Sequence, residues 1–125
     1  MTARYDWTIN QGETSTLVYT RFQSDGTTAQ NFVQDSTFRM QAKDKFGGTQ
    51  VLSLTTNGTT TASHFKHTLD DGVSNTVTIT IPATLTAAIA APGKYVYDME
   101  NVTEDGLTVE RVLEGTLIAT PEVTT

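Results

Sequence analysis

Residues 93–120 read Gly93-Lys-Tyr-Val-Tyr-Asp-Met-Glu-Asn-Val-Thr-Glu-Asp-Gly-Leu-Thr-Val-Glu-Arg-Val-Leu-Glu-Gly-Thr-Leu-Ile-Ala-Thr120. In the first half, Tyr95, Tyr97 and Met99 alternate with residues that are mostly polar. Successive side chains of a β-strand point to opposite faces, so this half predicts a strand with one aromatic, buried face.

The second half of the stretch repeats the alternation after a turn. Asp105-Gly106 is a strong reversal signal, because glycine, and to a lesser degree aspartate, tolerates positive φ. The apolar residues that share one face of the second arm are Leu107, Val109, Leu113, Leu117 and Ala119. We therefore predict a long antiparallel hairpin with one buried face. Arg111 interrupts that face, and Gly115 indicates a bulge that shifts the register locally.

Composition places the whole chain in one class. Its 125 residues suit a single domain spanning 1–125, and 37% hydrophobic with 18% charged residues is typical of a soluble globular protein. No apolar run approaches the roughly 18 residues of a membrane helix. The N-terminus has no apolar signal region, so we expect the mature chain to start at residue 1 or 2 and to stay in the cytosol that made it.

Several functional classes are disfavoured by the same counts. The chain has no cysteine, which excludes a disulfide framework, a thiol nucleophile and a zinc-thiolate site. The net charge is −6, and the eight basic residues are scattered, which argues against a nucleic-acid surface. We predict no cofactor, no metal and no membrane partner.

Threonine is the compositional outlier, with 26 copies. β-branched residues suit a pleated surface and are stiff in helices, so the excess predicts an all-β fold with at most one short helix. Besides the two arms of the hairpin, the predicted strands are 5–10, 14–23, 36–43, 51–54, 64–69 and 76–81. About eight short strands separated by turn signals indicate an antiparallel β-sandwich.

The alternation also predicts which residues form the core. In strand 5–10, Tyr5, Trp7 and Ile9 face inward. In strand 14–23 two assignments compete, with either Leu17 and Tyr19 or Val18 and Phe22 facing the core. Residues 82–91 are predicted to be a short helix on the spacing of Leu85, Ala88 and Ile89. The core residues on which we rely most are Trp7, Phe38, Val77, Ile79, Tyr95, Tyr97 and Leu113.

Catalytic and ligand-binding patterns are weak. His64 and His67 would point to opposite faces of a strand, which is poor geometry for a metal site. The carboxylates lie in turns or on polar strand faces, where a solvated role is more common than glycosidase chemistry. Aromatic pairs such as Tyr5/Trp7 and Tyr95/Tyr97 suit a carbohydrate-stacking platform, but core packing is the commoner outcome at alternating strand positions.

Several phrases resemble a family of small tailed-phage virion proteins. Tyr5 to Gly12 is similar to the opening "Tyr-Asp-x-x-Ile-x-Gln-Gly" of that family. Tyr95 to Glu100 and Arg111 to Gly115 are similar to its "Tyr-Val-Tyr-Asp-Leu-Glu" and "Arg-Leu-Leu-Glu-Gly". The remaining phrases that carry the resemblance are Asp25 to Thr27, Phe38 to Ala42, Thr78 to Ala88 and Pro121 to Thr124. The resemblance spans nearly the whole chain.

The resemblance implies a fold and a role. Such proteins recur in phages of cyanobacteria and other bacteria, and they are similar to the N-terminal immunoglobulin-like domain of upper baseplate proteins. It implies an immunoglobulin-like sandwich that acts, without enzymatic activity, as a structural protein of the tail, neck or baseplate. Its partners would be other virion proteins and further copies of itself in a symmetric assembly, and its location the virion. The alternatives are a capsid decoration protein and a carbohydrate-binding module.

Sheet edges and their flanking loops are where we expect partners to bind. The loops 24–35 and 55–63 are polar, tolerate change and flank edge strands with few guarding charges. The residues predicted to contact neighbouring subunits are Phe32, Val33, Thr59, Thr60, Phe65 and Lys66. Phe32 and Phe65 are the expected apolar anchors, so replacing both by Asp is expected to leave the domain folded but to prevent its incorporation into particles.

Overall fold

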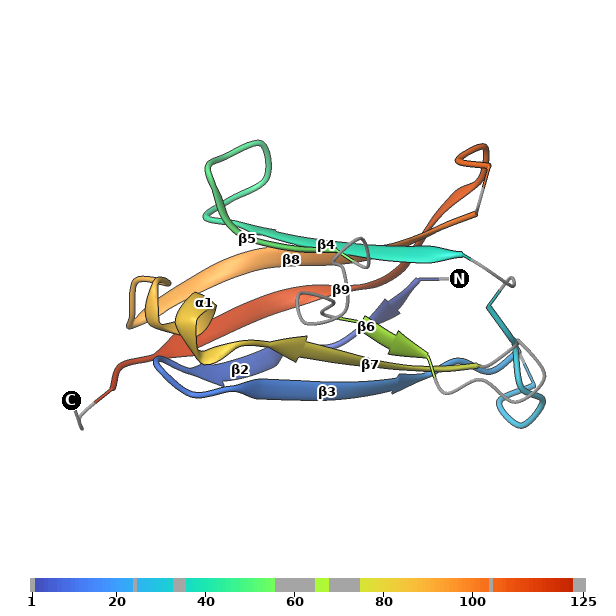
Figure 1. Ribbon diagram of the computed structural model, residues 1–125, viewed down its shortest axis with the longest axis horizontal. Helices are drawn as coiled ribbons and strands as arrows, with labels where there is room; N and C mark the ends of the chain where they lie inside the picture. The colour runs from blue at the N-terminus through green and yellow to red at the C-terminus, as the bar shows by residue number, and fades with distance from the viewer. Residues whose placement is uncertain are drawn as a thin grey trace.

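The computed structural model describes residues 2–23, 25–32, 36–55, 65–67, 75–103 and 105–122; for Thr55 and residues 65–67 only the backbone is described. Within these residues the chain forms nine strands and one short helix (Figure 1). These elements are β1 (Ala3–Arg4), β2 (Trp7–Asn10), β3 (Ser15–Thr20), β4 (Thr37–Lys43), β5 (Gln50–Thr55), β6 (Phe65–His67), β7 (Thr76–Ile81), α1 (Ala83–Ala87), β8 (Gly93–Val102) and β9 (Val109–Thr120).

The strands form two packed sheets. The large sheet has the order β1-β9-β8-β4-β5, with β2 also paired to β9, and the small sheet has the order β3-β7-β6. The predicted hairpin lies at the centre of the large sheet as β8 and β9, with Tyr95 opposite Leu117. One part of the predicted architecture is wrong: β1 and β2 run parallel to β9, so the large sheet is mixed rather than purely antiparallel.

The strand order is immunoglobulin-like. The first strand pairs with the last, the large sheet continues through β8, β4 and β5, and the small sheet joins β3, β7 and β6, as in the sandwich of that name. Tyr95, near the start of β8, donates its hydroxyl to the carbonyl of Ala90 five residues upstream. That contact matches the tyrosine corner of immunoglobulin-like folds. No helix within the described residues is both long and apolar enough to cross a membrane.

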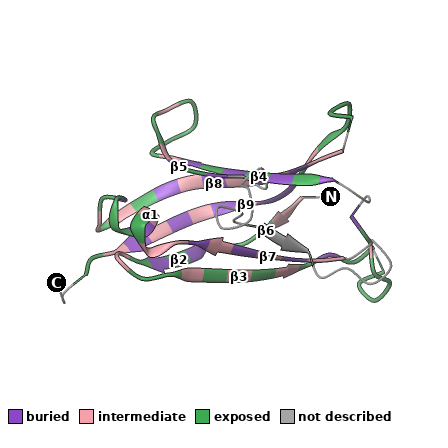
Figure 2. Cartoon of the chain, in the orientation of Figure 1, coloured by how far each residue is buried: buried purple, intermediate pink, exposed green. Residues whose placement is uncertain are grey.

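The core lies between the two sheets, as predicted. All seven residues on which the prediction rested are buried in one cluster: Trp7, Phe38, Val77, Ile79, Tyr95, Tyr97 and Leu113. Their strands alternate buried with exposed or half-buried positions, which Figure 2 shows as alternating colours along β7, β8 and β9. In β3, Leu17 and Tyr19 pack against the core, whereas Val18 is 60% exposed, which decides between the two assignments left open by the sequence.

The predicted face of β9 is wrong before Leu113. Met99 pairs with Leu113, whereas Glu100 pairs with Arg111, so Val112 is an extra residue and forms a bulge. We predicted a bulge at Gly115, and the observed bulge lies three residues before it. Because one inserted residue reverses the face of everything before it, Val109 and Leu107 are exposed and Val112 is buried. Arg111 therefore points outward and does not interrupt the buried face of β9.

Two smaller predictions also need correction. Tyr5 is 46% exposed, because it lies in the break between β1 and β2 rather than in a continuous strand. The helix is only five residues long and ends before the predicted 91. Ile89 is buried and Leu85 packs against the core, but Ala88 is exposed. The buried position in the helix is Thr86, whose hydroxyl donates to the carbonyl of Glu13.

Candidate functional site

The outer face of the large sheet is flanked by two loops that rise on the same side, away from the small sheet (Figure 1). One is the β4–β5 loop, residues 44–49, and the other is the β8–β9 turn around Asp105-Gly106. We call the outer face of β4, β8 and β9 together with these two loops the cradle. Its outward residues alternate with the core residues of the same strands.

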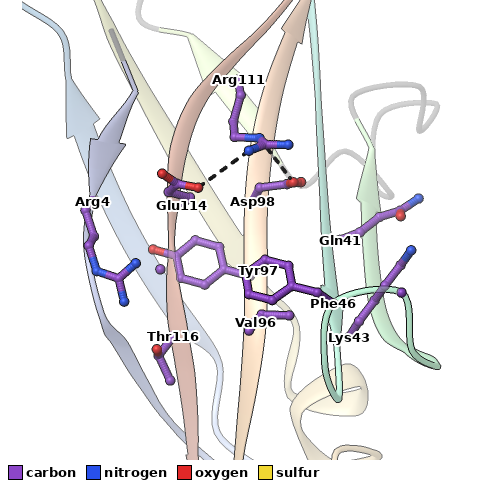
Figure 3. Close-up of a pocket in the computed structure, with 12 residues that line it drawn as sticks. Arg4, Gln41, Lys43, Phe46, Val96, Tyr97, Asp98, Arg111, Glu114 and Thr116 are labelled. Carbon is purple, nitrogen blue, oxygen red and sulfur yellow. Dashed lines mark ion pairs between the residues drawn. The ribbon is translucent and has the colours of Figure 1, made fainter.

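The floor of the cradle is charged but balanced. Arg111 lies between two carboxylates, with its Nε 3.4 Å from Asp98 Oδ2 and its Nη1 3.6 Å from Glu114 Oε2 (Figure 3). At the next outward position of β8 after Asp98, Glu100 Oε1 lies 2.6 Å from Arg39 Nε. Part of this floor is hollowed into a shallow groove of about 350 Å³, whose lining includes Arg4 and Phe46.

Burial disturbs one group in this floor. Partial desolvation raises the pKa of Asp98, with Glu100 and Glu114 adding to the rise and Arg111 opposing it. The three side chains of the Arg111 cluster are each 39–52% exposed, and such pairs contribute about 0–1 kcal/mol to stability. The cluster therefore stabilises the fold little and presents oriented charge at the surface.

Each end of the cradle carries an exposed apolar side chain. Phe46 is 87% exposed and Leu107 is 84% exposed. The loop that carries Phe46 is held by its own hydrogen bonds, since Asp44 N donates to Thr49 O and Thr49 N donates to Asp44 Oδ1. The turn that carries Leu107 is held in the same way, because Leu107 N donates to Asp105 Oδ1. Rigid loops with exposed apolar tips are suited to docking.

Three phrases of the sequence converge beside this groove. Tyr97 donates its hydroxyl to the carbonyl of Tyr5, and Thr116 N donates to Asp6 Oδ1. Burial raises the pKa of Tyr97, so its hydroxyl stays a proton donor to high pH. Gly115 lies where the Tyr5 backbone crosses β9, and a Cβ at this position would collide with the Tyr5 carbonyl. The glycine is thus required by close approach, not by a bulge.

Replacing Gly115 by alanine is expected to lift residues 3–6 away from β9. The added methyl group occupies the place of the Tyr5 carbonyl, so the Tyr97–Tyr5 hydrogen bond is lost or stretched. Overpacking of this kind costs about 1–3 kcal/mol. Urea unfolding measures the loss, and Tyr97→Phe, which removes the hydroxyl without the collision, is the control. A Gly115→Ala variant as stable as the parent would contradict this account.

The structure describes only some of the predicted interface residues. Phe32 is 2% exposed and packs edge-on against Phe38 with ring centroids 4.9 Å apart, so it is a core residue and not a surface anchor. Replacing it by Asp is therefore expected to unfold the domain. Val33, Thr59 and Thr60 lie outside the described residues, as does His64. Phe65, Lys66 and His67 are placed in β6 by their backbone, with Phe65 opposite the core residue Ile79.

The aromatic stacking platform is contradicted by burial. Trp7, Tyr95 and Tyr97 are each less than 10% exposed. A sugar-binding surface needs aromatic rings open to solvent, so these three cannot provide one.

Sequence reasoning missed the two tips of the cradle. The signal was present at Phe46, an aromatic residue set between Lys45 and the breaker Gly47-Gly48, where no strand could bury it. Leu107 was assigned to the wrong face because the bulge at Val112 is not visible in the alternation.

No protein-family model matches the chain, and no curated protein matches it in sequence.

Proposed function

We propose that this protein is a structural component of a tailed-phage virion, without enzymatic activity, in the tail, neck or baseplate. It would hold neighbouring subunits or fibres through its sheet faces and edges. The proposal begins with the resemblance of seven phrases spread from Tyr5 to Thr124. A capsid decoration protein would use the same kind of surface and differs only in where it lies on the particle.

The observation that carries the proposal is the junction beside the groove. The opening Tyr5-Asp6, the Tyr97 of the second quoted phrase and the Gly115 of the third contact one another through hydrogen bonds and close backbone approach. The opening phrase thus forms one structural unit with two phrases that lie 92 residues or more further along the chain. This supports reading them together as one pattern rather than as separate chance matches.

The cradle supports an assembly role in particular. It offers a charge-balanced floor for orientation and two exposed apolar tips, Phe46 and Leu107, that a neighbour can cover. Interfaces commonly combine such apolar anchors with a polar surround. Among the described strands β5, from Gln50 to Thr55, lies at an edge of the large sheet; it contains no charged residue and is a second place for contact.

The experiment is to locate the protein and then to block its incorporation. Mass spectrometry and immunogold labelling of purified particles are expected to find the protein at a fixed copy number on the tail, neck or baseplate. Phe46→Asp is expected to leave the isolated protein folded and to lower its incorporation. Thr84→Asp, which adds the same charge at an exposed position of α1, is the control.

Each outcome of this experiment has a clear meaning. Labelling of the capsid shell would favour the decoration protein, and absence from particles would reject the virion proposal. Normal incorporation of folded Phe46→Asp would reject the cradle as the contact surface.

A further inference from the structure

The outward positions of β3 and β7 in the small sheet are almost all threonine. The register of β3 and β7 places Thr16 opposite Thr80, Val18 opposite Thr78 and Thr20 opposite Thr76. The three positions of β3 are exposed and those of β7 are half-buried, while the residues between them face the core. We call these six residues the threonine face. They account for five of the 26 threonines that made the composition unusual.

Folding alone does not require an uncharged surface here. The cradle, on the opposite side of the molecule, uses arginine, lysine, aspartate and glutamate at its outward positions. Residues 14–20 and 72–93, which include β3 and β7, contain no charged side chain. Charged residues on exposed sheets are a common protection against association, so this face lacks that protection.

Charge argues that the occupant of this face is a second copy of the chain. Each copy has a net charge of −6, so two copies repel one another over most orientations. The threonine face is where two copies can meet without bringing like charges together. In the register, Lys66 of β6 lies opposite Thr78, on the strand that borders the threonine face.

The chemistry of threonine makes the face complementary to itself. A two-fold interface sets the same patch against itself, so each group must suit its own copy. A hydroxyl both donates and accepts a hydrogen bond, and the threonine methyl packs against apolar groups. Thr20 and Thr76 already pair through their hydroxyls at 3.2 Å, which fixes the orientation of these two side chains in the threonine face. Val18, in the middle row and 60% exposed, supplies an apolar centre.

We infer that the threonine face is a self-association surface through which two copies pack their small sheets face to face. β-branched side chains are stiff, so burying them costs little side-chain entropy. Sheets pack about 10 Å apart, a spacing that short residues such as threonine and valine fill. The inference concerns the purified protein and does not rest on the virion proposal.

The test is the oligomeric state of the whole chain in solution. Sedimentation equilibrium from about 1 μM to about 1 mM, the range of modest affinities, is expected to show a mass rising from 13.6 kDa toward twice that value. Val18→Asp sets two carboxylates against each other across the two-fold axis and is expected to weaken association at least about tenfold. Thr84→Asp adds the same charge at an exposed position of α1, outside the threonine face, and is expected to leave association unchanged.

Salt and a second variant complete the design. Raising sodium chloride from about 50 mM to about 500 mM screens the repulsion between copies, so association is expected to hold or tighten, whereas an ion-paired interface would weaken. If circular dichroism shows that Val18→Asp fails to fold, Thr78→Lys places a charge in the threonine face instead, and its association is measured. A monomer at every concentration, or unchanged association in a folded Val18→Asp or Thr78→Lys variant, overturns the inference.

Discussion

Trp7→Ala is expected to lower the free energy of unfolding by about 3–5 kcal/mol, the usual range for truncating a buried aromatic residue. Trp7 is 3% exposed and meets Tyr97 edge-on, with ring centroids 6.3 Å apart. Its Nε1 donates to Ser15 Oγ at 3.0 Å, which ties β2 of the large sheet to β3 of the small one. Truncation therefore opens a cavity and removes a bond between the two sheets.

Two control variants separate these contributions. Trp7→Phe keeps most of the apolar volume but loses the indole N–H, so we expect a smaller loss. Tyr5→Ala removes a neighbouring aromatic side chain that is 46% exposed, and we expect a loss of about 1 kcal/mol or less, as for most surface substitutions. Urea unfolding of the three variants measures the loss in the free energy of unfolding for each and so tests this order. A Trp7→Ala variant that melts within about 2 °C of the parent would show that the residue does not join the sheets.

The sequence predicts the centre of this fold because one face of each central strand is buried. In β7, and from Tyr95 to Met99 of β8, every second residue is apolar, so the period of two gives both the strand and its inward face. The same reasoning places Trp7, Phe38 and Leu113 in the core correctly. Burial of a whole face is a repeated signal, and one ambiguous residue does not change it.

What the sequence does not reveal depends on contacts between distant residues. The bulge at Val112 turns Glu110 to the inner side of β9, where it meets Arg21, 89 residues earlier in the chain. Phe32 stands in a polar stretch and was taken for a surface anchor, yet it is buried beneath the same arginine. Neither outcome can be obtained from local alternation, because the partner lies on another strand.

The features of the candidate site likewise divide into those that alternation predicts and those that depend on distant contacts. The outward charges of β4 and β8 could be predicted from alternation, and so could the turn at Asp105-Gly106. The rise of both loops on one side of the sheet could not, because it depends on the twist and pairing of the strands. The threonine excess predicted strands, but the pairing of β3 with β7 was needed to gather those residues on one face.

Arg21→Met is expected to cost about 3 kcal/mol, nearly as much as the loss of Trp7. The Arg21 side chain is 8% exposed, and its Nη1 lies 2.6 Å from Glu110 Oε1. Its Nε and Nη2 donate to the carbonyls of Gln30 and Asn31, and its guanidinium lies 4.2 Å from the centre of the Phe32 ring. Methionine keeps the apolar stem but leaves two carbonyls without their donor and uncovers the aromatic ring.

The size of this loss follows from burial. Breaking a buried ion pair costs about 3–5 kcal/mol, and the 41% exposure of Glu110 puts this case at the low end, because the freed carboxylate can be hydrated. Arg39→Met is the matched control. Arg39 Nε lies at the same 2.6 Å from Glu100, but its side chain is 50% exposed, so we expect a loss below about 1 kcal/mol.

Thermal melting of the two arginine variants tests the argument directly. For a domain of this size, a loss of about 3 kcal/mol lowers Tm by roughly 10 °C, whereas the control should move it by only a few degrees. Equal shifts in the two variants would mean that distance, not burial, sets the value of these pairs. A large fall in Arg21→Met alone would place Arg21 among the residues that hold the 21–32 segment against β9, together with Phe32 and the bulge that presents Glu110.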